Sequence, residues 1–236
     1  MGNFGLKWEA FVRAFIDQNG YKTVLEGLRN TVLVAVFGLL IGIVIGTLIA
    51  AVEVMPKYKV LPRVLSKICG VYVAFFRGTP LVVQLLVGYF VLRPMLGLGL
   101  DALTTCIIIY GMNSGAYVSE IMRGGIQSVD IGQTEAGRAL GLSYFTTMTS
   151  IVIPQAVKNI LPTLGNEFIA LVKDTSIVSF VGTTDLYVAF KFIGTNNYEF
   201  MVPYLVMALV YIVMVLLITV GIHFMEKGLK KSDRHH

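Results

Sequence analysis

The chain has 236 residues, of which 56% are hydrophobic and 14% are charged, and its mean hydropathy is +0.75. Soluble domains carry about 25% charged residues, so this composition excludes an ordinary soluble protein and predicts a membrane protein. The net charge of +5 comes from cations spread over short loops and tails, which favours membrane topology over nucleic-acid binding. Cys69 and Cys106 lie inside apolar runs, as expected of buried thiols rather than a disulfide or a metal site.

The N-terminal segment, residues 1–27, contains an amphipathic pattern. Apolar side chains recur at i, i+3, i+4, i+7 and i+8, and they are Trp8, Phe11, Val12, Phe15 and Ile16. This spacing predicts a helix of about three turns. The helix lies either in the membrane interface or against the helix bundle.

Five segments are long and apolar enough to be membrane spans, because a span needs about 20 mostly apolar residues. In chain order they are residues 28–54, 68–92, 100–122, 151–181 and 202–225. The fourth also carries prolines, amides and charges, so it is expected inside the bundle or against a partner. The predicted fold is an all-α membrane protein with about five transmembrane helices in one domain, residues 28–226.

Cations are concentrated in regions that five spans place on one side of the membrane. They are Lys57, Lys59, Arg63 and Lys67 after the first span, Arg123 and Arg138 in a central loop (residues 123–150), and Lys227, Lys230, Lys231 and Arg234 in the tail (residues 227–236). Short loops rich in lysine and arginine stay in the cytoplasm. The sequence therefore predicts a multi-pass cell-membrane protein with a cytoplasmic C-terminus and an N-terminus outside.

Three glycines, Gly38, Gly42 and Gly46, repeat every four residues on one face of the first span. Small residues at this spacing let a second helix approach closely. The pattern predicts helix packing, and it leaves open whether the partner helix belongs to the same chain.

The second span is interrupted at residues 77–80, Arg-Gly-Thr-Pro. Pro80 removes one backbone hydrogen bond and Gly78 loosens the turn, so we expect a break where protein or a polar cavity satisfies the freed carbonyls. Arg77 is expected to be a paired structural charge. Gln84 is a candidate for lining a solute path.

The third span carries a polar stripe, because Asn113, Tyr117 and Glu120 fall at i, i+4 and i+7. Asn113 and Tyr117 are candidates for lining a solute path, and the alternative for Asn113 is a hydrogen bond between helices. Glu120 is expected to pair with Arg123 rather than to contact solute.

The fourth span holds two carboxylates, Glu167 and Asp174, which are seven residues apart and so lie on one helix face. Carboxylates inside a membrane are costly, and a pair on one face would attract a cationic or zwitterionic solute. The alternative is permanent neutralisation by Lys173 or by a cation of another chain.

The central loop predicts a short helix followed by a tight turn. Asp130 can cap the start of the helix, Glu135 lies in its early part, and Gly141 can adopt the left-handed conformation at its end. A polar helix between membrane spans is a place where a soluble partner can bind.

The residues Glu135-Ala136-Gly137, followed by Gly141 and, after nine residues, by Ile151-Val152-Ile153-Pro154, resemble the EAA loop of permease subunits in bacterial ATP-binding cassette (ABC) importers. The family has alanine at position 137 and leucine at position 153. Blocks around residues 76–85, 110–120 and 164–176 are similar to the branch that carries polar amino acids, the histidine, glutamine, arginine and opine group. The resemblance covers about residues 20–226.

The resemblance implies a type I importer (MetI-like) permease in which Glu135, Ala136, Gly137 and Gly141 dock on a separate ATPase dimer. That dimer would hold the ATP-Mg, and this chain would have no cofactor, no metal and no catalytic residue. A second permease subunit, identical or paralogous, and an external amino-acid-binding protein are the other implied partners. In some relatives that bind basic amino acids, acidic residues at these two motif positions contact the solute, so the resemblance implies the same role for Glu167 and Asp174.

Two other functions remain possible on sequence alone. One is an ion-coupled secondary amino-acid transporter, a class that commonly shows internal repeats and more spans. The other is a non-transporting membrane scaffold or a channel subunit, which leaves the spacing of the central loop unexplained. The chain contains no GxxxxGK[ST] phosphate loop, so ATP hydrolysis would have to come from another subunit.

Overall fold

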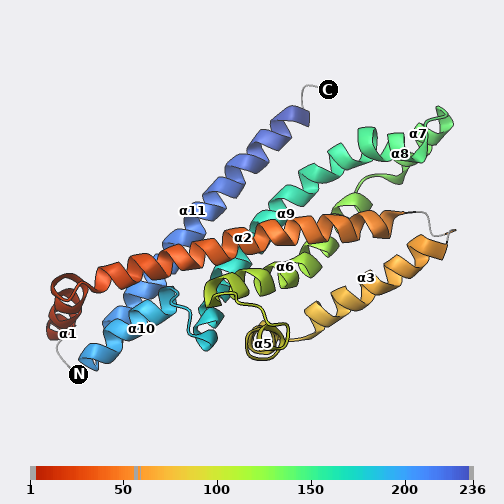
Figure 1. Cartoon of the computed structure of the whole chain (residues 1–236). Helices are drawn as coiled ribbons and strands as arrows, with labels where there is room; N and C mark the ends of the chain where they lie inside the picture. Colours follow the sequence, from red (N-terminus) through yellow and green to blue (C-terminus); the bar gives the residue numbers. More distant parts are fainter. Residues whose placement is uncertain (1–3, 56–57, 59, 234–236) are drawn as a thin grey trace.

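The computed structural model describes residues 4–55, 58 and 60–233, and within these ranges the chain forms helices and no strand (Figure 1). The main helices are α1 (Phe4–Val12), α2 (Gly20–Val54), α3 (Val60–Gly78), α4 (Leu81–Val87), α5 (Arg93–Met95), α6 (Ala102–Gln127), α7 (Ile131–Ala139), α8 (Tyr144–Thr147), α9 (Ile153–Asp174), α10 (Leu186–Asn197) and α11 (Met201–Asp233). Short π-helical or 3-10 segments follow four of them: η1 (Arg13–Asp17), η2 (Gly88–Leu92), η3 (Met148–Val152) and η4 (Thr175–Val181).

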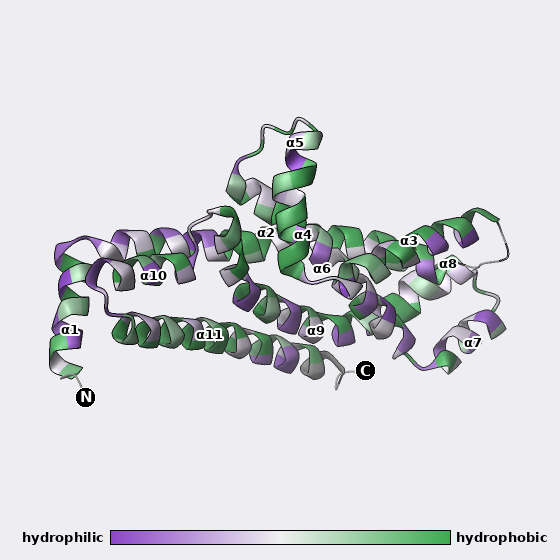
Figure 2. Ribbon diagram, turned by 90° about the horizontal axis from the view of Figure 1, so that it is seen from below, coloured by the Kyte–Doolittle hydropathy of each residue, from purple (hydrophilic) through white to green (hydrophobic). Residues whose placement is uncertain are grey.

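Two helices, α2 and α11, are each long and apolar enough to cross a membrane unaided. Two bent pairs, α3 with residues 81–95 and residues 144–181 with α10, pass the same test as broken spans. Helix α6 is 26 residues long, but it is not among the helices that pass this test, because its polar residues lower its hydrophobicity. In Figure 2 the hydrophobic colouring is dense on α4 and α11, in keeping with a membrane-embedded chain.

The second predicted span needs correction. Residues 68–92 do not form one straight helix, because α3 begins earlier, at Val60, and the chain bends by 106° at the predicted break. In Figure 2, α4 and α5 stand out from the other helices. Arg63 and Lys67 therefore lie on α3 and not in a loop, whereas Lys57, Lys59 and Arg234 fall outside the described residues.

The fourth predicted span is also followed by a second bend, which was not predicted from the sequence. Helix α9 continues through η4 to Val181, and Gly182 then adopts φ +75°, a left-handed conformation that ends the segment. Helix α10 follows at 57° to it. The carboxylate of Asp185 caps α10 by accepting hydrogen bonds from the backbone N–H groups of Tyr187 and Val188.

The N-terminal helix packs on the bundle through one face. Phe11 is buried against Leu186 and Phe190 of α10, whereas Trp8 and Ile16 on the same amphipathic segment are exposed. An ion pair of 2.9 Å between Lys7 and Glu199 ties α1 to the start of α11. Of the two predicted positions, packing on the bundle is therefore the one observed, and the exposed residues remain available to the membrane interface.

The glycine repeat of α2 packs against α6 of the same chain. A Cβ atom built on Gly42 would lie 2.8 Å from the Cβ of Ser114, and one on Gly46 would lie 2.7 Å from the Cβ of Val118. The backbones of α2 and α6 can therefore approach this closely only because the glycines have no side chain. The partner helix of the glycine repeat, which the sequence left open, therefore belongs to the same chain.

We expect Gly46→Val to lower the thermal midpoint of the purified protein by several degrees, because it overpacks this contact at a cost of about 1–3 kcal/mol. Gly70→Val on α3 is the matched control, since a Cβ at Gly70 meets no atom within 4 Å. Equal midpoints for the two variants would contradict the role of the glycine repeat.

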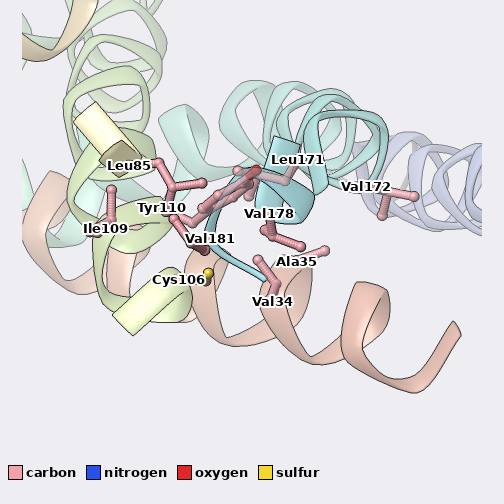
Figure 3. Packing of buried hydrophobic residues seen from close by; sticks show 10 residues of the cluster. All are labelled: Val34, Ala35, Leu85, Cys106, Ile109, Tyr110, Leu171, Val172, Val178 and Val181. Atoms are coloured by element: carbon pink, nitrogen blue, oxygen red, sulfur yellow. The ribbon is translucent and has the colours of Figure 1, made fainter. Parts of the chain in front are cut away.

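The central core brings α2, α4, α6, α9 and η4 around Tyr110 (Figure 3). The ring of Tyr110 is fully buried, and its hydroxyl donates a 2.6 Å hydrogen bond to the backbone carbonyl of Asp174. This bond ties the middle of the core to the last residue of α9. At the ends of the molecule, α7 and α8 lie opposite α1 and α10 (Figure 1).

Candidate functional site

Helices α6 and α9 pack together and carry the polar residues singled out in the third and fourth spans. Ser114 of α6 donates a 3.0 Å hydrogen bond to Oε1 of Glu167 on α9. Asp174 is the last residue of α9. It lies two helical turns, a rise of about 10 Å, beyond Glu167, and its side chain is exposed. Within the described residues neither carboxylate forms an ion pair within 4 Å with a lysine or arginine.

Gln84 and Asn113 are brought together at the break between α3 and α4. The amide nitrogen of Gln84 donates to the carbonyl of Phe76 at 2.8 Å and to the carbonyl of Thr79 at 3.0 Å. Asn113 donates to Oε1 of Gln84 at 2.8 Å. The two buried amides therefore satisfy carbonyls that the bend releases, as a break within the membrane requires.

We expect Gln84→Leu to lower the thermal midpoint clearly, because it leaves buried carbonyls unpaired at a cost of about 1–3 kcal/mol. Gln155→Leu is the control, since Gln155 is exposed and, among the described residues, donates to the carbonyl of Ile151 one turn earlier and to the side chain of Gln133. If Gln84→Leu melts like the control but no longer transports solute, Gln84 is a path residue and not a brace.

Arg77 and Glu120 form a charged cluster between α3 and α6. Glu120 lies 2.7 Å from Arg123 and 3.4 Å from Arg77, so the predicted pairing of Glu120 and the predicted pairing of Arg77 are both confirmed. The guanidinium of Arg77 also lies over the ring of Tyr117, 5.6 Å from its centroid. Tyr117 thus contacts Arg77, and its ring remains partly exposed.

The central loop has the predicted helix, cap and turn. The carboxylate of Asp130 accepts a 2.6 Å hydrogen bond from the N–H of Gly132 at the start of α7. At its end Gly141 has φ +76°, and the N–H of Leu142 donates to the carbonyl of Gly137 in a Schellman arrangement. Gly137 is buried where a Cβ would lie 2.7 Å from the side chain of Thr147, so α7 is held against α8.

The outer face of this loop is open. Glu135 and Ala136 are exposed, and so are the large apolar side chains of Ile131, Leu140 and Phe145, each at least 74% exposed. Exposed apolar side chains gathered beside polar ones are typical of protein-binding surfaces. Together these residues, 131–145, form what we call the coupling surface.

Several residues that hold the site together were missed by the sequence analysis. Asp185 is fully buried beside α2, where Asn30 donates a 2.8 Å hydrogen bond to the carbonyl of Thr184. A Cβ on Gly27 would lie 2.4 Å from the carbonyl oxygen of Asp185, so the start of α10 presses on α2. An aspartate after Gly-Thr-Thr and before an apolar run is a helix-start signal that could have revealed α10.

Comparisons with known proteins agree with this architecture. Residues 38–231 match the family model of the binding-protein-dependent transport system inner membrane component. The chain is 37% identical over 210 residues to the arginine transport system permease protein ArtQ of Bacillus subtilis, covering 89% of this chain and 94% of that one. It is 37% identical over 206 residues to a putative glutamine transport system permease protein GlnP of Rickettsia bellii, covering 87% and 92%.

Solved structures confirm the MetI-like type I importer fold. A crystal structure of an amino acid ABC transporter with histidines matches with a TM-score of 0.81 and 36% identity, covering 90% of this chain and 97% of that one. The MetNI methionine ABC transporter, in an inward-facing conformation, matches with a TM-score of 0.73 and 18% identity, covering 88% and 96%, a likeness of fold. The chain therefore belongs to the family of binding-protein-dependent transport system inner membrane components, the permeases of ABC importers.

Proposed function

We propose that this chain is the permease subunit of an ATP-driven importer that carries a basic amino acid across the cell membrane. The observation that carries the proposal is that one helix bundle presents two functional features at different places. One is the exposed coupling surface around α7, and the other is the pair of carboxylates, Glu167 and Asp174, on the face of α9. Of the related permeases, the one named for arginine transport supports a basic solute, whereas the one named for glutamine transport supports a polar amino acid more broadly.

The partners follow from the family and from the surfaces of the chain. A second permease subunit, identical or paralogous, faces this one across the path, and an ATPase dimer that holds ATP-Mg docks on the coupling surface. A binding protein delivers the amino acid from outside. The N-terminus is then outside and the C-terminus is in the cytoplasm, since α1 lies at the end of the molecule opposite α7 (Figure 1).

The chain itself makes and breaks no covalent bond. ATP binding closes the ATPase dimer and displaces α7, which is braced on α8 through Gly137 and Thr147. The hydroxyl of Tyr144 on α8 donates to the carbonyl of Val54, so the displacement also reaches the end of α2. Rocking of the packed helices α2, α6 and α9 then opens the path outward, and ATP hydrolysis returns the helices to the arrangement in which the path is closed to the outside.

Reconstitution of the complex tests the proposal. We expect the chain to co-purify with a stoichiometric ATPase, and uptake of arginine, lysine or histidine into proteoliposomes to require ATP and the binding protein. Uptake that needs an ion gradient and no ATPase would instead identify an ion-coupled secondary transporter. Neither the fold nor the relatives favour that alternative.

A further inference from the structure

A cavity lies beside Arg77, on the side of Glu167 that faces α7. Its volume is about 460 Å³, and its lining comes from α3, α6, α9 and the residue after α6. The residues that matter here are Arg77, Tyr117, Glu120, Gly124, Asn159 and Thr163. None of the roles assigned above to the carboxylates of α9 accounts for this cavity.

The cavity continues the polar face that carries Glu167. Asn159, Thr163 and Glu167 follow one another at intervals of four residues along α9, so each is one helical turn, or about 6 Å, from the next. On α6 the stripe of Tyr117 and Glu120 faces the same cavity. A solute that leaves Glu167 toward α7 therefore meets this cavity next.

The charged side chains that line the cavity are complementary to the α-carboxylate and the α-ammonium of an amino acid. Arg77 and Glu120 are 3.4 Å apart, and their side chains are 45% and 30% exposed, so both can be reached by a solute. Glu120 also accepts two hydrogen bonds from Arg123, so a solute ammonium would share this carboxylate with Arg123. The α-carboxylate and the α-ammonium of an amino acid are separated by a single carbon atom. They can therefore contact the guanidinium of Arg77 and the carboxylate of Glu120 at the same time. A guanidinium binds a carboxylate with two parallel hydrogen bonds, and Tyr117 supports the guanidinium from one side.

The shape of the cavity is also suitable. A Cβ on Gly124 would meet no atom within 4 Å, so the absence of a side chain there leaves room in the cavity. Asn159 donates a 2.8 Å hydrogen bond to the hydroxyl of Ser128, which links α9 to the end of α6 on the coupling-loop side.

We propose that this cavity is a second amino-acid subsite, in which Arg77 binds the α-carboxylate and Glu120 binds the α-ammonium of the solute on its way to the cytoplasm. The inference rests on the proposed function and adds a site to it. Glu167 and Asp174 would recognise the basic side chain, whereas Arg77 and Glu120 would recognise the groups that all amino acids share.

Equilibrium binding of labelled arginine to the purified permease–ATPase complex, without nucleotide or binding protein, tests the subsite. We expect Glu167→Gln to retain a site for arginine that agmatine, which lacks the carboxylate, does not compete for. Adding Gly124→Leu, which fills the cavity and leaves every charge in place, should weaken that remaining site by about tenfold or more. Arg77→Gln should do the same, and Gly221→Leu on α11 is the control because a Cβ there also meets no atom.

The outcomes separate the two proposals. If wild-type complex binds arginine and Glu167→Gln abolishes all binding, the proposed function stands and the second subsite is wrong. The subsite is equally wrong if Gly124→Leu leaves the remaining site unchanged, or if agmatine competes for it as well as arginine does. If the wild-type complex neither binds nor transports any amino acid, both proposals fail.

Discussion

Gly141→Asp is expected to lower ATP-driven uptake about tenfold or more while basal ATP hydrolysis by the complex continues. Gly141 lies at the carboxyl end of α7 with φ +76°, and it is exposed in the coupling surface. An aspartate there places a negative charge at the negative end of the helix dipole and inside the proposed ATPase contact. The measurement is uptake and ATP hydrolysis in the same proteoliposomes.

Gly141→Asn is the matched control for this prediction. Asparagine has nearly the same shape as aspartate and also tolerates a left-handed backbone, but it adds no charge. We expect Gly141→Asn to keep most of the coupling. Normal uptake by Gly141→Asp would show that the end of α7 does not lie against the ATPase.

Glu167→Gln is expected to lower uptake of a basic amino acid by about tenfold to a hundredfold and to spare the uptake of any neutral amino acid that the complex carries. The carboxylate is half-buried, it accepts one hydrogen bond from Ser114, and it has no ion-pair partner among the described residues. Its charge is therefore available to a cationic solute. Uptake of a basic and a neutral amino acid by the same vesicles measures the effect.

Two further variants make the test specific. Ser114→Ala removes only the hydrogen bond to Glu167 and should give a smaller loss than Glu167→Gln. Glu9→Gln removes an exposed carboxylate from α1 and should leave uptake unchanged. Unchanged uptake of the basic amino acid in Glu167→Gln would remove this residue from the solute site.

Local signals in the sequence predicted much of the structure. Spacing alone located the cap, helix and left-handed glycine of the central loop, because each depends on a few neighbouring residues. The family resemblance, carried by the same loop, supplied the fold and the transport function. The glycine repeat predicted a close helix contact for the same local reason.

The rest depended on contacts between distant residues. The 106° bend after α3 follows from Pro80, but its direction is fixed by hydrogen bonds from Gln84 and Asn113 that no local pattern reveals. Asp185 is a local signal for the start of α10, but the position of that start against α2, through Asn30 and Gly27, depends on distant contacts. Arg77 was expected to be paired, yet only the packing of α3 on α6 shows that its partner is Glu120.

The central claim is that the polar face of α9 lines a path that ATP opens toward the outside. The most direct test introduces Asp174→Cys at the outer end of that face and Thr163→Cys near its inner end, in protein whose own cysteines are replaced by serine. Modification rates with a membrane-impermeant thiol reagent are compared in the nucleotide-free and the ATP-trapped complex. We predict faster modification of Asp174→Cys and slower modification of Thr163→Cys when ATP is trapped, whereas rates that do not depend on nucleotide would contradict the account.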